Sequence, residues 1–271
     1  DAPMEYTNSS KELVLSFPID DGTVERFEVV EAPVMAPGLA AKYPNIKSYR
    51  GIGLDNPLNS IHFNYSLNEF YGSIHTSDGM IYIDPFTEGS GEFSMVYNIS
   101  KMTEIDESMI STLSCGVTSD MLDEVGSPKE STALTRSIKI PALLKVYRFA
   151  LGCTGEYASL KGGTLEAVNA AFVTAMSRVN QIFQLEVGVK LELIEDNDRL
   201  INLDGATDPY ENPTIGTGLL GQTFSAFTAA GVFQNTYDLG QVFTVRCTDG
   251  IAGVVSGRAC VEDTKMRGVT C

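Results

Sequence analysis

Cys115 stands apart from the other cysteines of the sequence. Cys153, Cys247, Cys260 and Cys271 all follow position 150, and they could form two disulfides among themselves in three possible connectivities. Cys115 would then be left for an intermolecular bridge or as a free thiol kept for chemistry. A thiolate binds zinc strongly, and in the open position of a catalytic zinc it would displace the water and silence the enzyme. The alternative is a small buried apolar side chain, which is what most free cysteines are.

His62 and His75 are the only histidines of the chain. A catalytic zinc normally has three protein ligands, usually led by histidines. On neighbouring strands the two histidines could meet, and together with Cys115 they would make a three-ligand set. The alternatives are two solvated or hydrogen-bonded strand histidines, and a thiol enzyme that pairs Cys115 with one of them, although no orienting partner is visible.

Other catalytic motifs are missing from the sequence. It contains no H-E-x-x-H, no G-x-S-x-G, no phosphate-binding P-loop and no G-x-G-x-x-G opening a helix. Residues 196–208, "DNDRLINLDGATD", carry several carboxylates and amides and are a candidate calcium loop. They lack the EF-hand spacing with its final glutamate, so a polar loop without a metal is the favoured interpretation.

The charge of the chain argues against a nucleic-acid partner. The formal net charge is −16, whereas binding to a phosphate backbone needs a basic surface. Residues 1–136 hold 21 acidic against 8 basic residues, and residues 137–271 hold 14 against 11, which suggests two functionally different halves. No apolar run is long enough for a membrane span. The N-terminus has no signal-peptide pattern, so if the protein is secreted, its signal peptide has already been removed.

The first hundred residues are rich in strand signals. Residues 12–33 are two β-type runs joined by Asp20-Asp21-Gly22, a hairpin pattern. Further short strands follow about every ten residues, with another turn at 77–79 and a short helical insert before Pro44. This spacing predicts an antiparallel sandwich or a curled antiparallel sheet.

The second half alternates strands and helices. Its apolar strand at 143–154 has the composition of a strand buried on both faces, and the apolar positions after Thr164 step by three or four, as on one helical face. This order predicts a three-layer α/β subdomain with a mainly parallel sheet, and an α+β protein overall. We place the domain boundary at residue 136, giving domains 1–136 and 137–271. The apolar helical positions are Leu165, Val168, Phe172, Ala175, Val179 and Ile182; the later elements are strand 187–195, helix 215–231 and strand 240–246.

Several segments carry a family resemblance. In the second half they are "YRFALGCTGEYA", "GGTLEAVNAAFVTAMSRVNQIF", "LELIEDNDRLI", "TDPYENP", "YDLGQVFTV" and "GIAGVVSGRACVEDTKMRGVTC". In this order they resemble the start of the catalytic domain of reprolysin-like (adamalysin-type) metzincin zinc metallopeptidases, particularly the secreted bacterial branch. The first half is similar to the matching pro-region, mainly through "GTVERFEVVEAPVMAPGLAAKYPNIKSYRG" and "MIYIDPF". The family's Cys-Gly-Val switch matches "CGV" at 115–117, although Thr-Leu-Ser precedes it where the family has Pro-Lys-Met.

The resemblance implies a latent zymogen. Its inhibitory pro-domain would be residues 1–136, with Cys115 as the blocking ligand of the catalytic zinc. Residues 137–271 would be an incomplete N-terminal catalytic subdomain. The family's H-E-x-x-H-x-x-G-x-x-H helix and Met-turn are not in the sequence, so we expect a chain truncated before them. Such a chain holds no catalytic residue of its own and has the rest of its catalytic domain as a partner.

The resemblance also implies peptide or protein substrates that lie extended along an edge strand. The matching segment is Ile251-Ala252-Gly253, with an ordinary edge strand as the alternative. Activation would need a cut between the halves, which we predict at Arg136–Ser137. Zinc is the expected cofactor, with no nucleic-acid or membrane partner. The competing functions are a non-catalytic secreted binding or adhesion module and a thiol enzyme using Cys115.

Overall fold

The computed structural model divides into two compact units. One comprises Asp1–Ile105 with Asn169–Glu186, and the other comprises Asp106–Val168 with Val187–Cys271. The predicted boundary at residue 136 and the predicted cut at Arg136–Ser137 lie outside the described residues and stay predictions. The structure describes residues 2–7, 10–20, 22–87, 89, 91–102, 114–115, 144–245, 247–248, 250–262, 264–265 and 267–271.

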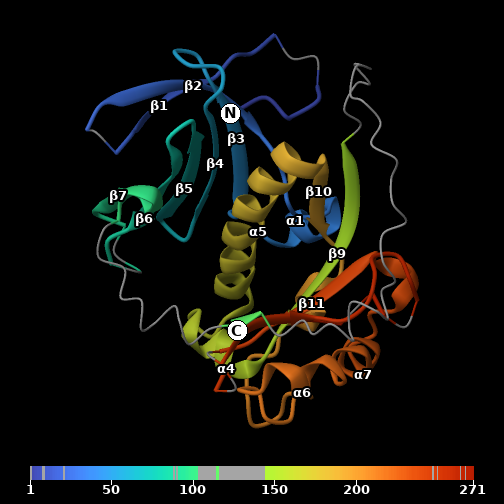
Figure 1. Ribbon diagram of the computed structural model, residues 1–271. Helices are drawn as coiled ribbons and strands as arrows, with labels where there is room; N and C mark the ends of the chain where they lie inside the picture. Colours follow the sequence, from blue (N-terminus) through green and yellow to red (C-terminus); the bar gives the residue numbers. More distant parts are fainter. Residues whose placement is uncertain are drawn as a thin grey trace, which may run out of the picture. The chain divides into compact units, whose positions relative to one another are not determined.

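The first unit contains a seven-stranded antiparallel sheet in which each strand pairs with the next along the chain (Figure 1). The two predicted turns join its first two strands and its fifth and sixth strands, as expected. Helix α1 (Pro37–Lys42) lies between the second and third strands, and a 3₁₀ turn, η1 (Ile99–Lys101), follows the last. The strands are β1 (Val14–Pro18), β2 (Val24–Glu31), β3 (Lys47–Gly53), β4 (Ser60–Ser66), β5 (Glu69–Thr76), β6 (Gly79–Pro85) and β7 (Ser94–Asn98).

This sheet curls around its own apolar core. The Phe17 ring on β1 lies 5.1 Å from the Phe63 ring on β4 and 5.7 Å from the Phe70 ring on β5. Strands β1 and β4 are separated by two others in the sheet, so these contacts require strong curvature. The curled antiparallel sheet expected from the strand spacing is therefore confirmed. Its buried core residues are Phe17, Phe27, Val29, Ile61, Phe63, Ile74, Ile81 and Ile83.

The second unit contains a six-stranded mixed sheet in the order β10-β9-β11-β13-β12-β8. The first four strands of this order run parallel to one another, β12 runs antiparallel to β13, and β8 runs parallel to β12. This arrangement confirms an α+β fold whose second half is built on a mainly parallel sheet. The strands are β8 (Ser114–Cys115), β9 (Lys145–Cys153), β10 (Val189–Leu193), β11 (Leu239–Phe243), β12 (Ile251–Val255) and β13 (Gly268–Thr270).

A capping residue and a glycine determine where helices of the second half begin and end. The hydroxyl of Thr164 accepts a hydrogen bond from the N–H of Ala167 at 3.1 Å, so Thr164 caps its helix as predicted. The single helix expected over 215–231 is instead two short helices that meet around Gly221, because glycine lowers helix propensity at this point. The elements are α4 (Gly155–Leu160), α5 (Leu165–Val187), η2 (Asn197–Leu200), α6 (Gly216–Leu220), α7 (Thr223–Ala229) and η3 (Gln234–Thr236).

Helix α5 is buried on more sides than its apolar stripe indicates. Val168 and Phe172 from the predicted stripe are fully buried, whereas Leu165 and Ile182, near its ends, are exposed. The helix also buries four uncharged polar side chains, which the apolar pattern does not reveal. These are Asn169, Ser177, Asn180 and Gln181.

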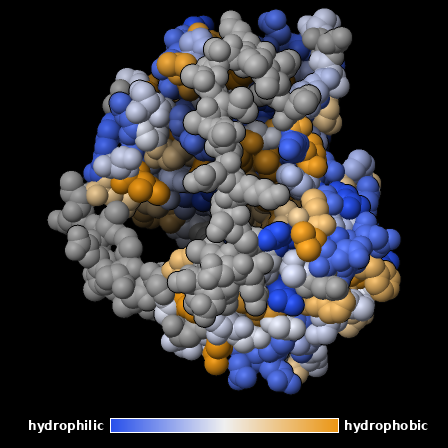
Figure 2. All heavy atoms as spheres, turned by 45° about the vertical axis from the view of Figure 1, so that its right-hand side comes forward, coloured by the Kyte–Doolittle hydropathy of each residue, from blue (hydrophilic) through white to orange (hydrophobic). Residues whose placement is uncertain are grey.

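Exposed hydrophobic side chains occur in both units. Figure 2 shows hydrophobic residues at several separate places on one face, with hydrophilic residues between them. Scattered exposure of this kind is ordinary for a protein surface. Among the helices of the described residues, none has both the length and the apolarity that a membrane crossing requires.

The curled core gives a direct stability prediction. Replacing Phe27, which is 0% exposed, by Ala removes a ring from the core and leaves a cavity, so we expect the free energy of unfolding to fall by about 3 to 5 kcal/mol. Val24→Ala on the same strand is the control, because Val24 is 62% exposed. Urea unfolding followed by far-UV circular dichroism measures both. Equal losses from the two variants would contradict the core assignment.

Candidate strand-binding edge

Strand β12 is paired along both of its sides. On one side Gly253, Val254 and Val255 pair with β13. On the other side Ile251 pairs with Ser114 and Gly253 pairs with Cys115, with an irregular register between them. The two residues of β8 therefore take up main-chain positions at the outer edge of β12, the segment that the sequence singled out as a substrate edge.

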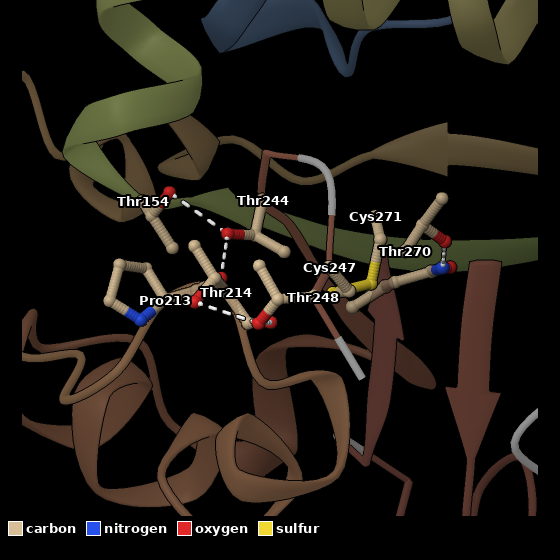
Figure 3. Close-up of a disulfide and its surroundings, with 9 residues drawn as sticks. Thr154, Pro213, Thr214, Thr244, Cys247, Thr248, Thr270 and Cys271 are labelled. Carbon is tan, nitrogen blue, oxygen red and sulfur yellow. Dashed lines mark hydrogen bonds between the residues drawn. A yellow bond between two sulfur atoms is a disulfide. The ribbon is translucent and has the colours of Figure 1, made fainter. Parts of the chain in front are cut away.

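A disulfide fixes the strands next to this edge (Figure 3). Cys247, in the loop after β11, is bonded to Cys271 directly after β13. The N–H of Cys271 donates to the carbonyl oxygen of Ala252 at 2.9 Å. A Cβ atom at Gly216 would lie 3.3 and 3.4 Å from the two sulfurs, so the first residue of α6 packs closely on the disulfide.

Three threonines extend this support (Figure 3). The N–H of Thr244 donates to the carbonyl oxygen of Thr270 at 2.9 Å. Its hydroxyl donates to the carbonyl oxygen of Pro213 at 2.5 Å and lies 3.3 Å from the buried hydroxyl of Thr154. These bonds tie β13, the start of α4 and the loop before α6 to the end of β11. The backbone beside β12 is thus held from several directions.

The cysteines fall into three environments. Cys247 and Cys271 form the disulfide, whereas Cys115, Cys153 and Cys260 are free. Burial raises the pKa of the Cys153 thiol to about 12, so Cys153 stays protonated and is a poor nucleophile and metal ligand. Cys115 and Cys260 are exposed. The four-cysteine set from the sequence thus contains one disulfide in the structure, and the exposed thiol beside β12 belongs to Cys115.

The two histidines lie in the other unit. His62 on β4 pairs with Ser73, and His75 on β5 pairs with Ser60. This register puts the two imidazoles on the same face of neighbouring strands as a diagonal pair. Cys115 belongs to the second unit. Within the described residues, no group of three or more His, Cys, Asp or Glu side chains is arranged to hold a metal ion.

In the candidate calcium loop, the carboxylates of Asp204 and Asp208 form hydrogen bonds with nearby residues. Asp204 accepts hydrogen bonds from the N–H of Ala206 and the hydroxyl of Thr207. Asp208 accepts from the N–H of Gly155 at 2.7 Å and from that of Tyr210 at 2.9 Å. These carboxylates accept hydrogen bonds from backbone and hydroxyl donors of the loop and of the start of α4.

The geometry defines what this region can do. Backbone groups along the edge of β12 accept a further strand, which is how many proteins bind an extended peptide. The sequence indicated this edge through its family resemblance, but the pairing with residues 114–115 had no local signal, because two residues carry too little pattern. In the described residues no metal-holding group lies beside the edge.

Residues 143–267 match the family model described as metallo-peptidase family M12B, reprolysin-like. Over these residues the chain is similar to the reprolysin-like metallopeptidases, which supports the resemblance. No curated protein matches the sequence. Members of such a family depend generally on zinc and act on peptide bonds.

The disulfide should support the edge measurably. Replacing both Cys247 and Cys271 by Ser opens a loop of 24 residues' separation, and we expect a loss of about 2 to 4 kcal/mol in the free energy of unfolding. Hydrogen exchange at the β12 amides should speed up as well. Cys260→Ser, which alters an exposed free thiol, is the control. An unchanged exchange rate in β12 would argue against this support.

Proposed function

We propose that this chain is the latent portion of a secreted zinc-dependent endopeptidase. Residues 1–136 act as an inhibitory pro-domain, and residues 137–271 form the N-terminal subdomain of the catalytic domain. Cys115 is the inhibitory ligand from this chain, and a cut near Arg136–Ser137 removes it. The family match over residues 143–267 supports the peptidase class.

The observation that carries the proposal is the pairing of Cys115 with Gly253 on β12. A peptide that adds to this edge needs the main-chain groups of Ile251, Ala252 and Gly253. Ser114 and Cys115 use the same edge, so substrate and inhibitory segment compete for it. Inhibition then has two parts: the edge is occupied, and an exposed thiol is held beside it.

The described residues do not by themselves fit a catalytic zinc. The two histidines belong to the seven-stranded sheet and no metal-holding group is found among the described side chains. In this proposal the histidine ligands and the general base come from sequence outside this chain, and Cys115 contributes only the blocking thiol. The Cys247–Cys271 disulfide favours an oxidising, extracellular location.

The test replaces Cys115 by Ala in the full-length product. If Cys115 blocks the site, the uncut variant should hydrolyse a fluorogenic peptide library at least tenfold faster than the uncut wild type. Removing metal with a chelator should abolish this activity. The wild type should gain the same activity only after a cut that separates Cys115 from the catalytic domain.

Cys260→Ala is the matched control, since Cys260 is also exposed and free, and it should leave latency unchanged. If the uncut wild type is active and the uncut Cys115→Ala variant is not, the result would instead support the thiol enzyme. A full-length product that binds no zinc and never cleaves peptides would leave the non-catalytic binding module, which needs only the strand-accepting edge.

A further inference from the structure

The face of the seven-stranded sheet that α5 covers is polar. The hydroxyl of Ser73 donates to the side-chain oxygen of Gln181 at 2.6 Å. The amide nitrogen of Gln181 donates in return to the carbonyl oxygens of Ser60 and Ser73 at 3.0 and 3.1 Å. Two turns earlier on α5, the hydroxyl of Thr174 accepts a hydrogen bond from the side-chain amide of Asn64 at 2.9 Å. Gln181 and Asn64 are each 1% exposed, so these bonds are shielded from water.

An ion pair completes the same surface. The guanidinium of Arg178 pairs with the carboxylate of Asp84 on β6 and lies over the ring of Tyr82, 4.9 Å from its centroid. The hydroxyl of Tyr97 on β7 donates to the same carboxylate at 2.8 Å. Burial, together with this bond, raises the pKa of Tyr97 to about 12, so the phenol stays a donor at neutral pH.

These contacts form one continuous recognition surface. Thr174, Arg178 and Gln181 are spaced by four and three residues, so they lie on one face of α5. Their partners come from the neighbouring strands β4, β5 and β6, on the side of the sheet away from its apolar core. Interfaces between separable bodies are polar in this way, since water can satisfy the same groups once the bodies part.

We propose that the outer face of β4, β5 and β6 is a docking surface for α5, which holds residues 1–102 non-covalently after the chain is cut between the two units. The occupant is therefore a segment of this same chain. In the context of the proposed function, on which its biological meaning rests, a cut pro-domain stays bound until these contacts break. Release is then a second step of activation, separate from the cut.

The test uses the whole chain with a site-specific protease sequence inserted between Ile105 and Asp106. This position leaves Ser114 and Cys115 on the C-terminal piece, so the β8–β12 pairing cannot hold the pieces together. After complete cutting, size-exclusion chromatography and native mass spectrometry at micromolar concentration report association. We expect the two pieces to remain together. Immediate separation of the unsubstituted pieces overturns the proposal.

Charge reversal identifies the contacts. Asp84→Lys places a second cation against Arg178, and we expect the pieces to dissociate at least tenfold more readily. Combining it with Arg178→Asp restores an opposite pair and should recover most of the association. Asp78→Lys, in the exposed turn between β5 and β6, is the control and should have no effect.

The outcome does not depend on one variant folding. Circular dichroism of the uncut chains checks each variant, and Gln181→Ala replaces Asp84→Lys if the latter is unfolded. Association that is unchanged in whichever of these two variants folds overturns the assignment of the surface. No readout uses peptidase activity, so the docking surface and the proposed function can fail independently.

Discussion

The outer edge of β12, where β8 pairs, is the constraint on which the second unit depends. A strand at the edge of a sheet leaves a row of N–H and C=O groups without partners, and such a row either takes up another strand or must be protected. In this protein β8 occupies the row at Ser114 and Cys115. The disulfide, the threonines and the first residue of α6 all serve to keep β12 and β13 in the geometry that makes the row usable. The same geometry suits a peptide and the segment that excludes it.

The two sides of the seven-stranded sheet are stabilised by different physics. Inside the curl, Phe17, Phe27 and their neighbours are removed from water, and the hydrophobic free energy gained persists while the sheet stays folded. On the outer side, Gln181, Asn64 and Arg178 exchange hydrogen bonds with water for hydrogen bonds with protein, which changes the net free energy only modestly per bond. The apolar core therefore stabilises the sheet strongly, whereas the polar contacts with α5 stabilise the attachment of that helix only moderately.

The sequence predicted most of the architecture because its signals were local. Asp20-Asp21-Gly22 marks a hairpin and Thr164 caps a helix. The apolar run before Cys153 is a strand within the sheet, buried over its second half. Each of these signals depends on a few adjacent residues. Recognition of the second half as reprolysin-like rested on segments in a fixed order, and residues 143–267 match that family. These features could be predicted without knowing how the rest of the chain folds.

The features that could not be predicted from the sequence are contacts between residues far apart in the chain. Gln181 reads as an ordinary exposed position of an amphipathic helix, yet it is buried against Ser73, more than a hundred residues earlier. Cys260 and Cys153 count as disulfide candidates by composition, and only the fold separates a buried thiol from an exposed one. The pairing of Cys115 with β12 was not predicted, because no periodicity reaches from residue 115 to residue 253.

The loop that begins at Asp204 has a consequence for how this fold can vary. A Cβ atom at Gly155 would lie 2.0 Å from the backbone nitrogen of Gly205, and one at Gly205 would lie 2.5 Å from the carboxylate of Glu156. The loop and the first turn of α4 therefore meet backbone to backbone, with Asp208 closing the contact. Surface loops usually tolerate changes of length, but the length of this loop is constrained by its close packing on the first turn of α4. An insertion here must first displace the start of α4, so the loop can drift in sequence only at positions that point away from that helix.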